Sequence, residues 1–358
     1  MAPVLSRLQK IKGISLRVLA QNPAFEIYKK DVRLSNVEIV HIDQKSPHTL
    51  MKLATSELNM FKPLGVFCGI SGPGAGIDEF ILKAAKQAGI KRISFQDYWG
   101  YLNSETINNH GLIMVIDDYA KLKTSEISNA KIEVVGNPKY DNYNRIVASS
   151  LKEIFFKRHN IKKEEIVLGF IGQPLGNVDG YYKTVKAFSK AIMKLKKNIR
   201  CIYRPHPKEN INLQETIRAI LNQSKCSVDI QSNTDPIEEL FAGAEVIVTL
   251  FSTAGYDAQM FNKCSDKPLA STLYLMFERS IIDIFRTRNA IKEIPLSNPP
   301  YALTISKVKD LISGLELCMS SETKIQRHLH LQNVIRNTQT SENLIVELIS
   351  KELTSNVG

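Results

Sequence analysis

The sequence is poor in the features that mark several common classes of protein. Its five cysteines are far apart and form no CxxC pair, so we expect reduced thiols and no zinc ribbon. It has one tryptophan and no arginine-rich run with interleaved aromatics, which argues against a nucleic-acid partner. No apolar run approaches the ~18 residues that cross a bilayer, and the N-terminus lacks a signal-peptide core. We therefore expect a soluble, cytoplasmic protein.

The composition is otherwise that of a globular protein with a basic surface. Hydrophobic residues make up 43% and charged residues 23% of the 358, a length sufficient for two domains. Forty-seven basic residues against 36 acidic ones give a net charge of +11, which favours anionic partners. The basic stretch from Arg7 to Arg17 is expected to be a capping helix. Contact of this stretch with an anionic membrane, as a peripheral protein at its inner face, is the alternative.

Short apolar strands alternate with amphipathic helices in two rounds. The strands are expected at residues 37–42, 64–70, 91–95, 111–116 and 132–135, and then at 166–171, 199–203, 228–231, 246–250 and 302–305. Strand signals fade after Asp266, apart from the last of these. The alternation predicts an α/β protein with two doubly wound, Rossmann-like lobes and parallel sheets. The expected lobes are residues 1–148 and 164–335, with a linker at 149–163 and a C-terminal helix within 336–358 that can pack back on the first lobe.

The most distinctive stretch follows the strand at 199–203. Pro205 and Pro207 end this strand and hold Arg204 and His206 in extended conformations. A guanidinium, an imidazole and the ammonium of Lys208 then stand on a stiff loop at the carboxyl end of a strand, where open α/β sheets bind ligands. Three potential cations suit a phosphate or diphosphate. A rigid surface turn with solvated charges is the plainer interpretation.

Two further loops of the second lobe end strands in the same way. One runs from Gly172 and Gln173 to Gly180, and the other contains Ser252 and Thr253 at the start of a helix, a natural anion site. Asp257, one turn into that helix, could accept hydrogen bonds from a ribose diol. If the three strands are neighbours, their loops converge on one crevice.

The first lobe offers acids rather than cations. The glycine-rich loop at residues 71–76 would let backbone N–H groups approach a ligand, although it lacks the GxGxxG pattern of a dinucleotide site. Asp78 and Glu79 follow in the first turn of a helix, where acids suit the helix dipole. Asp97, beside the only tryptophan, is either an acid/base candidate or the cap of a turn. No acidic cluster has metal-ligand spacing, so we expect no metal.

Three motifs in this order resemble nucleotide-sugar enzymes of the GT-B architecture: Gly136-Asn-Pro-Lys-Tyr-Asp141, Arg204-Pro-His-Pro-Lys208 and Ser252-Thr-Ala-Gly-Tyr-Asp257. The likeness is to CDP-glycerol glycerophosphotransferases, bacterial sialyltransferases and non-hydrolysing UDP-N-acetylglucosamine 2-epimerases. In the first two groups a His-Pro pair and a Ser-Ser/Thr pair grip the donor's phosphates. These pairs map onto His206-Pro207 and Ser252-Thr253. The segment Phe251–Asp257 lacks the glycine pair of the epimerases, and the acid pair Asp78-Glu79 lacks the following glycine of the sialyltransferases.

The resemblance implies two lobes around a central cleft and an inverting, metal-independent transferase without a cofactor. A glycosyl or polyol-phosphate group would move from a CMP-, CDP- or UDP-activated donor to a cell-envelope glycan or lipid-linked acceptor. The expected donor-binding residues are Gly172, Gln173, Arg204, His206, Lys208, Ser252, Thr253 and Asp257. Asp97, Glu79 or Asp78 would deprotonate the acceptor, and His206 would hydrogen-bond the leaving phosphate. An epimerase of UDP-N-acetylhexosamine and a non-catalytic nucleotide-sugar-binding protein are the alternatives.

Overall fold

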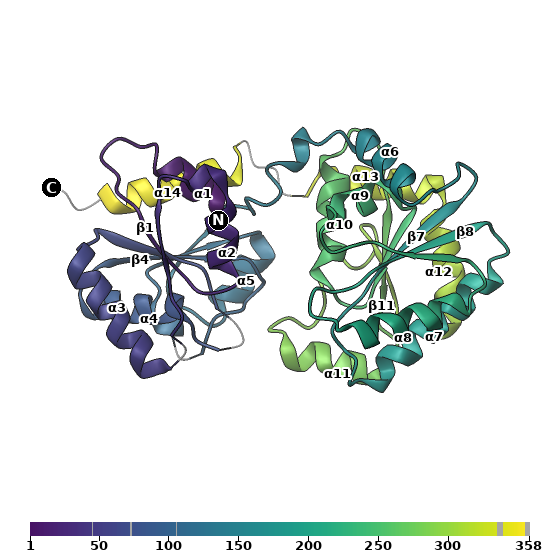
Figure 1. Ribbon diagram of the computed structural model, residues 1–358, viewed down its shortest axis with the longest axis horizontal. Coiled ribbons are helices and arrows are strands. Elements are labelled where there is room, and N and C mark those ends of the chain that lie inside the picture. The colour runs from purple at the N-terminus through teal and green to yellow at the C-terminus, as the bar shows by residue number, and fades with distance from the viewer. Residues whose placement is uncertain (45, 72–73, 105, 335–338, 355–358) are drawn as a thin grey trace. The chain divides into compact units, whose positions relative to one another are not determined.

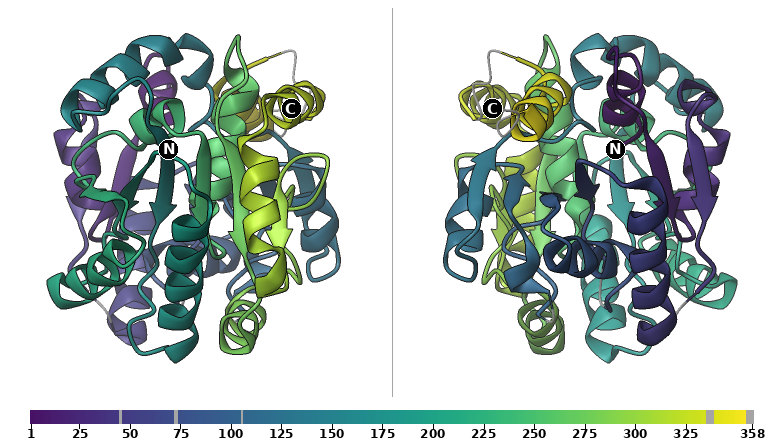
Figure 2. Two further views of the ribbon diagram at one scale, coloured as in Figure 1. Left: turned by 90° about the vertical axis from the view of Figure 1, so that its right-hand side faces the viewer. Right: turned by 90° about the vertical axis from the view of Figure 1, so that its left-hand side faces the viewer.

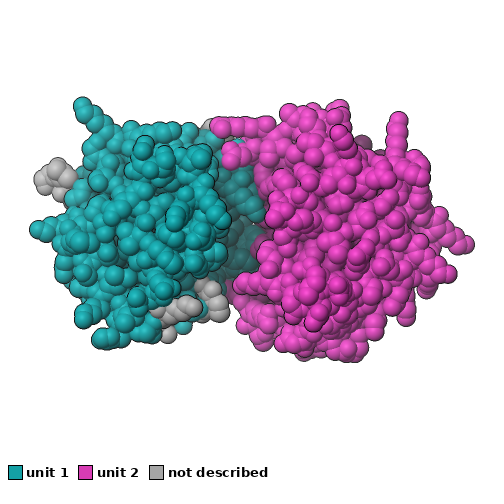
Figure 3. All heavy atoms as spheres, in the orientation of Figure 1, with its two compact units in different colours: residues 1–141, 335–358 teal, residues 142–334 magenta. Residues whose placement is uncertain are grey.

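The computed structural model describes residues 1–354 except 45, 72–73, 105 and 335–338. The chain forms two compact units, drawn as ribbons in Figure 1 and coloured separately in Figure 3. Unit 1 consists of residues 1–141 and 335–358, and unit 2 of residues 142–334. The boundary between them therefore falls earlier in the chain than the one expected from the sequence.

Unit 1 contains two parallel sheets. One pairs β1 (Arg17–Ala20) with β2 (Glu38–His41), and the other has the order β3 (Gly65–Cys68), β4 (Lys91–Gln96), β5 (Leu112–Val115) and β6 (Lys131–Val134). Its helices are α1 (Ala2–Leu8), α2 (Ala24–Lys30), α3 (Pro47–Phe61), α4 (Ile77–Gln87), α5 (Asp118–Ser125) and α14 (Ser341–Thr354). Short 3-10 turns η1 (Val32–Leu34) and η2 (Ile107–Asn109) complete the unit. All four residues of β5 are buried, as expected for a parallel strand covered on both faces.

Amphipathic helices bring the two sheets of unit 1 into one core. Leu50, Ala54 and Leu58 lie on the buried side of α3 and pack with the apolar face of α4. Leu19 of β1 and Val40 of β2 pack against the same cluster. The carboxyl end of β3, which leads into α4, therefore packs in the same apolar cluster as α3 and the sheet of β1 and β2.

Unit 2 has one six-stranded parallel sheet in the order β12-β11-β10-β7-β8-β9. The strands are β7 (Ile166–Ile171), β8 (Ile199–Arg204), β9 (Ser227–Ile230), β10 (Val246–Thr249), β11 (Ser271–Leu275) and β12 (Leu303–Ile305). The chain builds outward from β7 to β9, then returns to the other side of β7 and builds outward again. The strand order thus reverses between β7 and β10, the topological switch point of a doubly wound sheet.

Helices cover both faces of this sheet (Figures 1 and 2). They are α6 (Ala148–Arg158), α7 (Asp179–Lys194), α8 (Ile211–Asn222), α9 (Ile237–Gly243), α10 (Thr253–Cys264), α11 (Arg279–Arg288), α12 (Leu311–Met319) and α13 (Ser321–Gln332). One core cluster joins α7, α8 and α12 to the face of the sheet that carries Phe170 and Tyr203. On the other face Gly169 of β7 lies against Leu240 of α9 and Ile247 of β10. The predicted doubly wound α/β fold is confirmed.

Three expectations about individual segments are wrong. The helix and loop at residues 149–163, expected to link the two lobes, belong to unit 2: helix α6 packs on α9, Phe155 is fully buried, and Arg158 pairs with Glu239 at 3.0 Å. Strand β11 lies in the stretch where strand signals fade. Because all five of its residues are buried, it shows no alternation of polar and apolar residues. The N-terminal helix ends at Leu8, and Arg17 instead begins β1.

The two ends of unit 1 pack together. Helix α1 buries Val4 and Leu8 and contacts α14 and η1, which is the position of a capping helix. The carboxylate of Asp141 accepts hydrogen bonds from the backbone N–H groups of Ser341 and Glu342, at 2.9 and 2.8 Å. This carboxylate caps the start of α14, which also contacts β4.

Within the described residues, no helix has the length and apolar character needed to span a membrane. The same residues contain no group of three or more His, Cys, Asp or Glu side chains placed to hold a metal ion. All five cysteines are free thiols, and Cys68, Cys201 and Cys318 are buried.

The contact between α6 and α9 gives a test of the packing of unit 2. A Cβ atom added to Gly243 would overlap three atoms of the Phe155 ring, which is buried and unable to move without disturbing its neighbours. Gly243→Ala should lower the free energy of unfolding by about 1–3 kcal/mol, measured by urea denaturation. Gly74→Ala, where the added Cβ meets nothing within 4 Å, is the control. Equal stability of the two variants would contradict this packing.

Candidate functional site

The carboxyl edge of the unit 2 sheet carries the candidate site. Strand β7 pairs with β8 on one side and with β10 on the other, and all three strands are parallel. Their following loops therefore leave the sheet at the same edge, on both sides of the switch point. These are the three loops that the sequence analysis selected, and the topology makes them neighbours.

A buried glutamine links the two loops that flank the switch point. Gln173, in the loop after β7, is 6% exposed, and its Oε1 accepts a hydrogen bond of 3.1 Å from the backbone N–H of Phe251. One step earlier, the hydroxyl of Thr249 donates to the carbonyl of Ile171 at 3.2 Å. Because both bonds are buried or partly buried, the spacing of the two loops is set before any ligand arrives.

His206 stands in the loop after β8 and is partly exposed to solvent. Its Nδ1 accepts a hydrogen bond of 3.0 Å from the backbone N–H of Lys208. In the neutral ring, Nε2 therefore carries the proton and can act as a donor. Burial, reinforced by the charge of Lys208, lowers the pKa of His206, so the neutral donor form prevails at pH 7. The side chain of Lys208 itself is exposed.

Arg204 does not share the surroundings of His206. Its guanidinium donates to the backbone carbonyls of Ser232, Asn233 and Asp235 at 3.1, 3.4 and 3.0 Å. These three carbonyls belong to the loop between β9 and α9, which Arg204 anchors. These bonds give Arg204 a role in the scaffold, and its predicted contact with a diphosphate stays a prediction.

Ser252 and Thr253 begin helix α10, as expected. Ser252 is the N-cap residue, and its Oγ accepts a hydrogen bond of 3.2 Å from the N–H of Ala254. Thr253 is exposed. The free backbone N–H groups of a helix N-terminus favour an anion at this position.

Asp257, predicted to contact a ribose, lies in the interior of unit 2. It is only 7% exposed. Burial raises the pKa of Tyr143, and the nearby charge of Asp257 raises it further. The same two causes act on Tyr274, where burial again dominates. The carboxylate of Asp257 thus faces buried tyrosines of its own unit.

Glu209 is a residue of this edge that the sequence analysis missed. It is 5% exposed, and its carboxyl group lies between two phenols: Tyr181 donates to Oε1 at 3.3 Å and Tyr203 donates to Oε2. The hydroxyl of Tyr181 also accepts a hydrogen bond of 3.2 Å from the backbone N–H of Gln173. Burial raises the pKa of Glu209 to about 7, against the opposing effect of these hydrogen bonds. Its only signal in the sequence is its position directly after Lys208.

Gly172 is required by this carboxyl group. A Cβ atom at residue 172 would lie 2.5 Å from Oε1 of Glu209 and 3.0 Å from the ring of Tyr203. Gly172 was predicted to be one of the donor-binding residues. In the structure it provides the space that Glu209 occupies beneath the loop.

Two of the three candidate bases in unit 1 have structural partners. Asp78 accepts hydrogen bonds from the N–H of Gly69 at 2.9 Å and the hydroxyl of Ser71 at 3.2 Å. Glu79 accepts from the N–H groups of Ser71 and Gly76, both at 2.7 Å. Burial raises the pKa of both acids. They close the loop between β3 and α4, of which residues 72–73 lie outside the described residues.

Asp97 differs from these two acids. It follows β4 directly and is exposed, and among the described residues only its own backbone hydrogen-bonds to its carboxyl group. Desolvation by neighbouring atoms raises its pKa, and the charge of Lys139 opposes the shift. The indole of the adjacent Trp99 donates to Asp117 at 2.8 Å. Asp97 is therefore the candidate acid whose carboxylate is available to a substrate.

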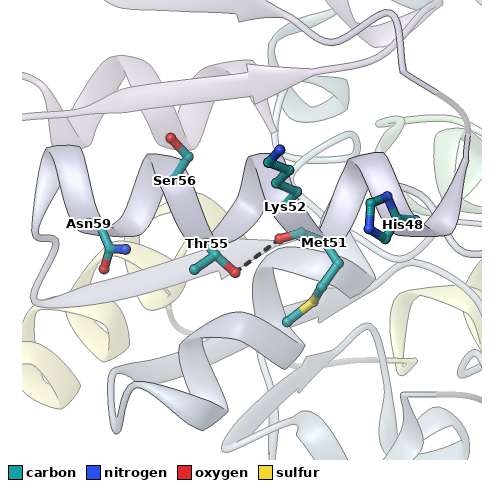
Figure 4. Close-up of a pocket in the computed structure, with 6 residues that line it drawn as sticks. All are labelled: His48, Met51, Lys52, Thr55, Ser56 and Asn59. Carbon is teal, nitrogen blue, oxygen red and sulfur yellow. Dashed lines mark hydrogen bonds between the residues drawn. The ribbon is translucent and has the colours of Figure 1, made fainter.

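A surface hollow of about 530 Å³ lies along α3 and is shown in Figure 4. Six side chains of this one helix line it: His48, Met51, Lys52, Thr55, Ser56 and Asn59. Five of the six are exposed, and Thr55 uses its hydroxyl to bond the carbonyl of Met51. The hollow is thus the solvated outer face of α3, and it contains none of the predicted site residues.

The sequence matches no protein-family model, and a search of curated proteins finds no similar sequence. Solved structures are similar along the whole chain. MurG of Acinetobacter baumannii has a TM-score of 0.62 at 13% identity, covering 98% of this chain and 94% of that one. S. aureus MnaA, in a structure with UDP, has a TM-score of 0.65 at 13% identity, covering 99% and 93%. The wall teichoic acid polymerase TagF has a TM-score of 0.55 at 11% identity, covering 100% and 94%.

At these identities the likeness is one of fold. It extends over both units. The chain therefore has the GT-B fold of two Rossmann-like lobes, as these solved structures do.

Proposed function

We propose that the protein is a metal-independent transferase that moves a glycosyl or polyol-phosphate group from a nucleotide-activated donor to a cell-envelope glycan or lipid-linked acceptor. One observation carries the proposal. At the switch point of unit 2, the His206 loop, the N-terminus of α10 and the Gln173 loop leave the same edge of the sheet. Positive charges and hydrogen-bond donors at that edge suit a diphosphate.

The chemistry follows from these donors. The N–H groups that open α10, with Ser252, would bind one phosphate, and Lys208 would add a charge. Nε2–H of His206 would donate to the oxygen that becomes negative as the bond to the leaving nucleotide breaks. Asp97 would take the proton of the acceptor hydroxyl, whose oxygen forms the new bond to the sugar carbon, with inversion, or to the phosphorus of a polyol-phosphate, as the bond to the leaving nucleotide breaks. Arg204 would hold the loop after β9, and Asp78 and Glu79 the loop between β3 and α4.

An epimerase of UDP-N-acetylhexosamine is the second candidate, because structures of UDP-N-acetylglucosamine 2-epimerases are among those similar to this chain. NMR of UDP-N-acetylglucosamine with the protein and no acceptor separates the two functions. Exchange at C2 of the sugar would identify the epimerase. Binding of donors with neither exchange, hydrolysis nor transfer would identify a non-catalytic protein.

The proposal predicts stabilisation by a nucleotide. A ligand that binds only the folded state raises the melting temperature. At a concentration of 100 times its Kd, it raises the free energy of unfolding by about 2.7 kcal/mol. In a thermal-shift panel of CMP, CDP, UDP and GDP, we expect at least one of the three diphosphates to raise Tm, and to raise it more than CMP does. Lys208→Gln should reduce that shift, and Lys52→Gln, at an exposed lysine of α3, should not. No shift with any member of the panel would contradict the proposed donor site.

His206 should matter more for turnover than for folding, because its ring is only partly buried. His206→Ala should reduce kcat by about 10²–10⁴ in a transfer assay and leave Tm nearly unchanged. His48→Ala, at an exposed histidine of α3, is the matched control. Full activity of the His206 variant would exclude it from the leaving-group role.

Asp97→Asn tests the base. The amide keeps the shape of the carboxylate but accepts no proton, so kcat should fall about 10²–10⁴ while the nucleotide-induced Tm shift persists. Glu26→Gln, an exposed acid of α2, provides the control. If Asp97→Asn retains kcat, the base lies elsewhere and Asp97 caps a turn.

A further inference from the structure

A buried chain of hydrogen bonds joins the three loops of the candidate site. It runs from the N–H of Phe251 to the side chain of Gln173, then from the N–H of Gln173 to the hydroxyl of Tyr181, and from that hydroxyl to Glu209. Glu209 also binds the hydroxyl of Tyr203 on strand β8. The chain therefore begins in the loop after β10, passes through the loop after β7 and ends in the loop after β8.

The main chain of Glu209 holds the turn that carries the histidine. Its N–H donates to the carbonyl of His206 at 2.8 Å, and its carbonyl accepts from Nε2 of Gln214 on α8 at 2.9 Å. The side chain fills the space under Gly172. One residue thus determines the position of the His206 turn, the Gly172–Gln173 backbone and, through Gln173, the start of the α10 segment.

We propose that Glu209 is a positioning residue of the nucleotide site, and that the site binds its anion more tightly when this carboxyl group is protonated. The inference rests on the proposed function for the identity of the anion. When ionised, Glu209 would place a negative charge directly beneath the loop that is to hold a diphosphate. When protonated, it would keep the same hydrogen-bonded geometry without that repulsion.

The groups around Glu209 support this reading. Tyr181 of α7 and Tyr203 of β8 face it with phenols, and burial raises the pKa of both, so they remain neutral donors. The loop after β7 contributes Gly172 and Gln173, and α8 contributes Gln214, none of which is charged. On its own turn stand the neutral His206 and the exposed Lys208. Burial raises the pKa of this carboxyl group to about 7, and within the described part of the chain no cation is hydrogen-bonded to it.

Because folding raises the pKa of Glu209, the stability that this carboxyl group contributes depends on pH. A carboxyl group whose pKa is raised by folding stabilises the folded state most below its ordinary pKa of 4.5. This contribution is lost as the pH rises through 7. A bound diphosphate would raise the pKa of Glu209 further, so binding should take up a fraction of a proton near neutral pH.

The experiment measures affinity against pH by titration calorimetry, with UDP-N-acetylglucosamine and CDP-glycerol as probes. Their diphosphates are doubly esterified and do not titrate between pH 6 and 8.5, whereas a terminal phosphate loses a proton near pH 6. Wild-type affinity for the probe that binds should fall about ten-fold across this range. Glu209→Gln, which keeps the shape without the charge, should bind as the wild type does at pH 6 and show little fall. Glu215→Gln, at an exposed acid of α8, should follow the wild type.

A second measurement needs no ligand. The amides of Gln173 and Phe251 both donate into the chain, so hydrogen exchange at these two positions reports its integrity. Glu209→Ala should accelerate exchange at both, while Glu209→Gln should not. The Tm of Glu209→Gln relative to wild type should also rise between pH 5 and pH 8, because only the wild type loses stability there.

The outcomes separate this proposal from the function on which it rests. If neither probe nor any nucleotide binds, while exchange and Tm behave as described, the positioning role stands and the proposed function falls. If a probe binds with the same pH dependence in wild type and Glu209→Gln, the proton linkage is wrong. Unchanged exchange in Glu209→Ala would overturn the positioning role.

Discussion

The organisation of unit 2 depends on one buried carboxyl group. Placing Glu209 in the interior costs free energy unless its oxygens are hydrogen-bonded, and two tyrosine hydroxyls provide those bonds. The arrangement leaves no room for a side chain at residue 172, so a glycine is needed there. The result is a buried cluster in which Glu209 fits between Tyr181 of α7, Tyr203 of β8 and the backbone of Gly172.

This cluster lies where a doubly wound sheet is open. The helices that follow β7 and β10 leave toward opposite faces, so their connecting loops part and expose the carboxyl edge between them. Loops at such a place would be mobile without support. The bond between Gln173 and Phe251, together with Glu209 below, holds them in one arrangement, so hydrogen-bond donors are oriented before a ligand binds.

Unit 1 uses buried acids differently. Asp78 and Glu79 accept hydrogen bonds from backbone N–H groups of the loop that precedes their own helix. Their carboxylates therefore stabilise this loop and have few lone pairs left for a substrate. Asp97 stands at the end of a strand, and among the described residues only its own backbone donates to its carboxyl group. An acid of the scaffold and a candidate base thus differ in the hydrogen-bond donors that their carboxylates already have.

Arg204 and His206 show a similar division within one loop. Each precedes a proline, but Arg204 is the last residue of β8, whereas His206 lies beyond the strand and begins a turn closed by the bond from the N–H of Glu209 to its carbonyl. The guanidinium of Arg204 reaches the carbonyls of the loop after β9. His206, beyond the end of the strand, folds its ring onto the N–H of Lys208 and keeps Nε2 for another partner.

Local patterns in the sequence were enough to predict the α/β class, most strands and the loops at their carboxyl ends. Alternation, proline and glycine report backbone conformation over a few residues, which is all that these features need. They fail where burial removes the alternation, as in β11. They also fail where a tertiary contact determines which domain a segment joins, as the buried Phe155 does for the helix that was expected to link the two lobes.

The contents of the site were decided only by the tertiary structure. Tyr181 and Glu209 are 28 residues apart, and Gln173 and Phe251 are 78 apart, so nothing in the neighbourhood of any of them indicates its partner. The strand order brings these residues to one edge of the sheet. A hydrogen bond is directional and short, and it can be assigned only once the fold has placed its two atoms.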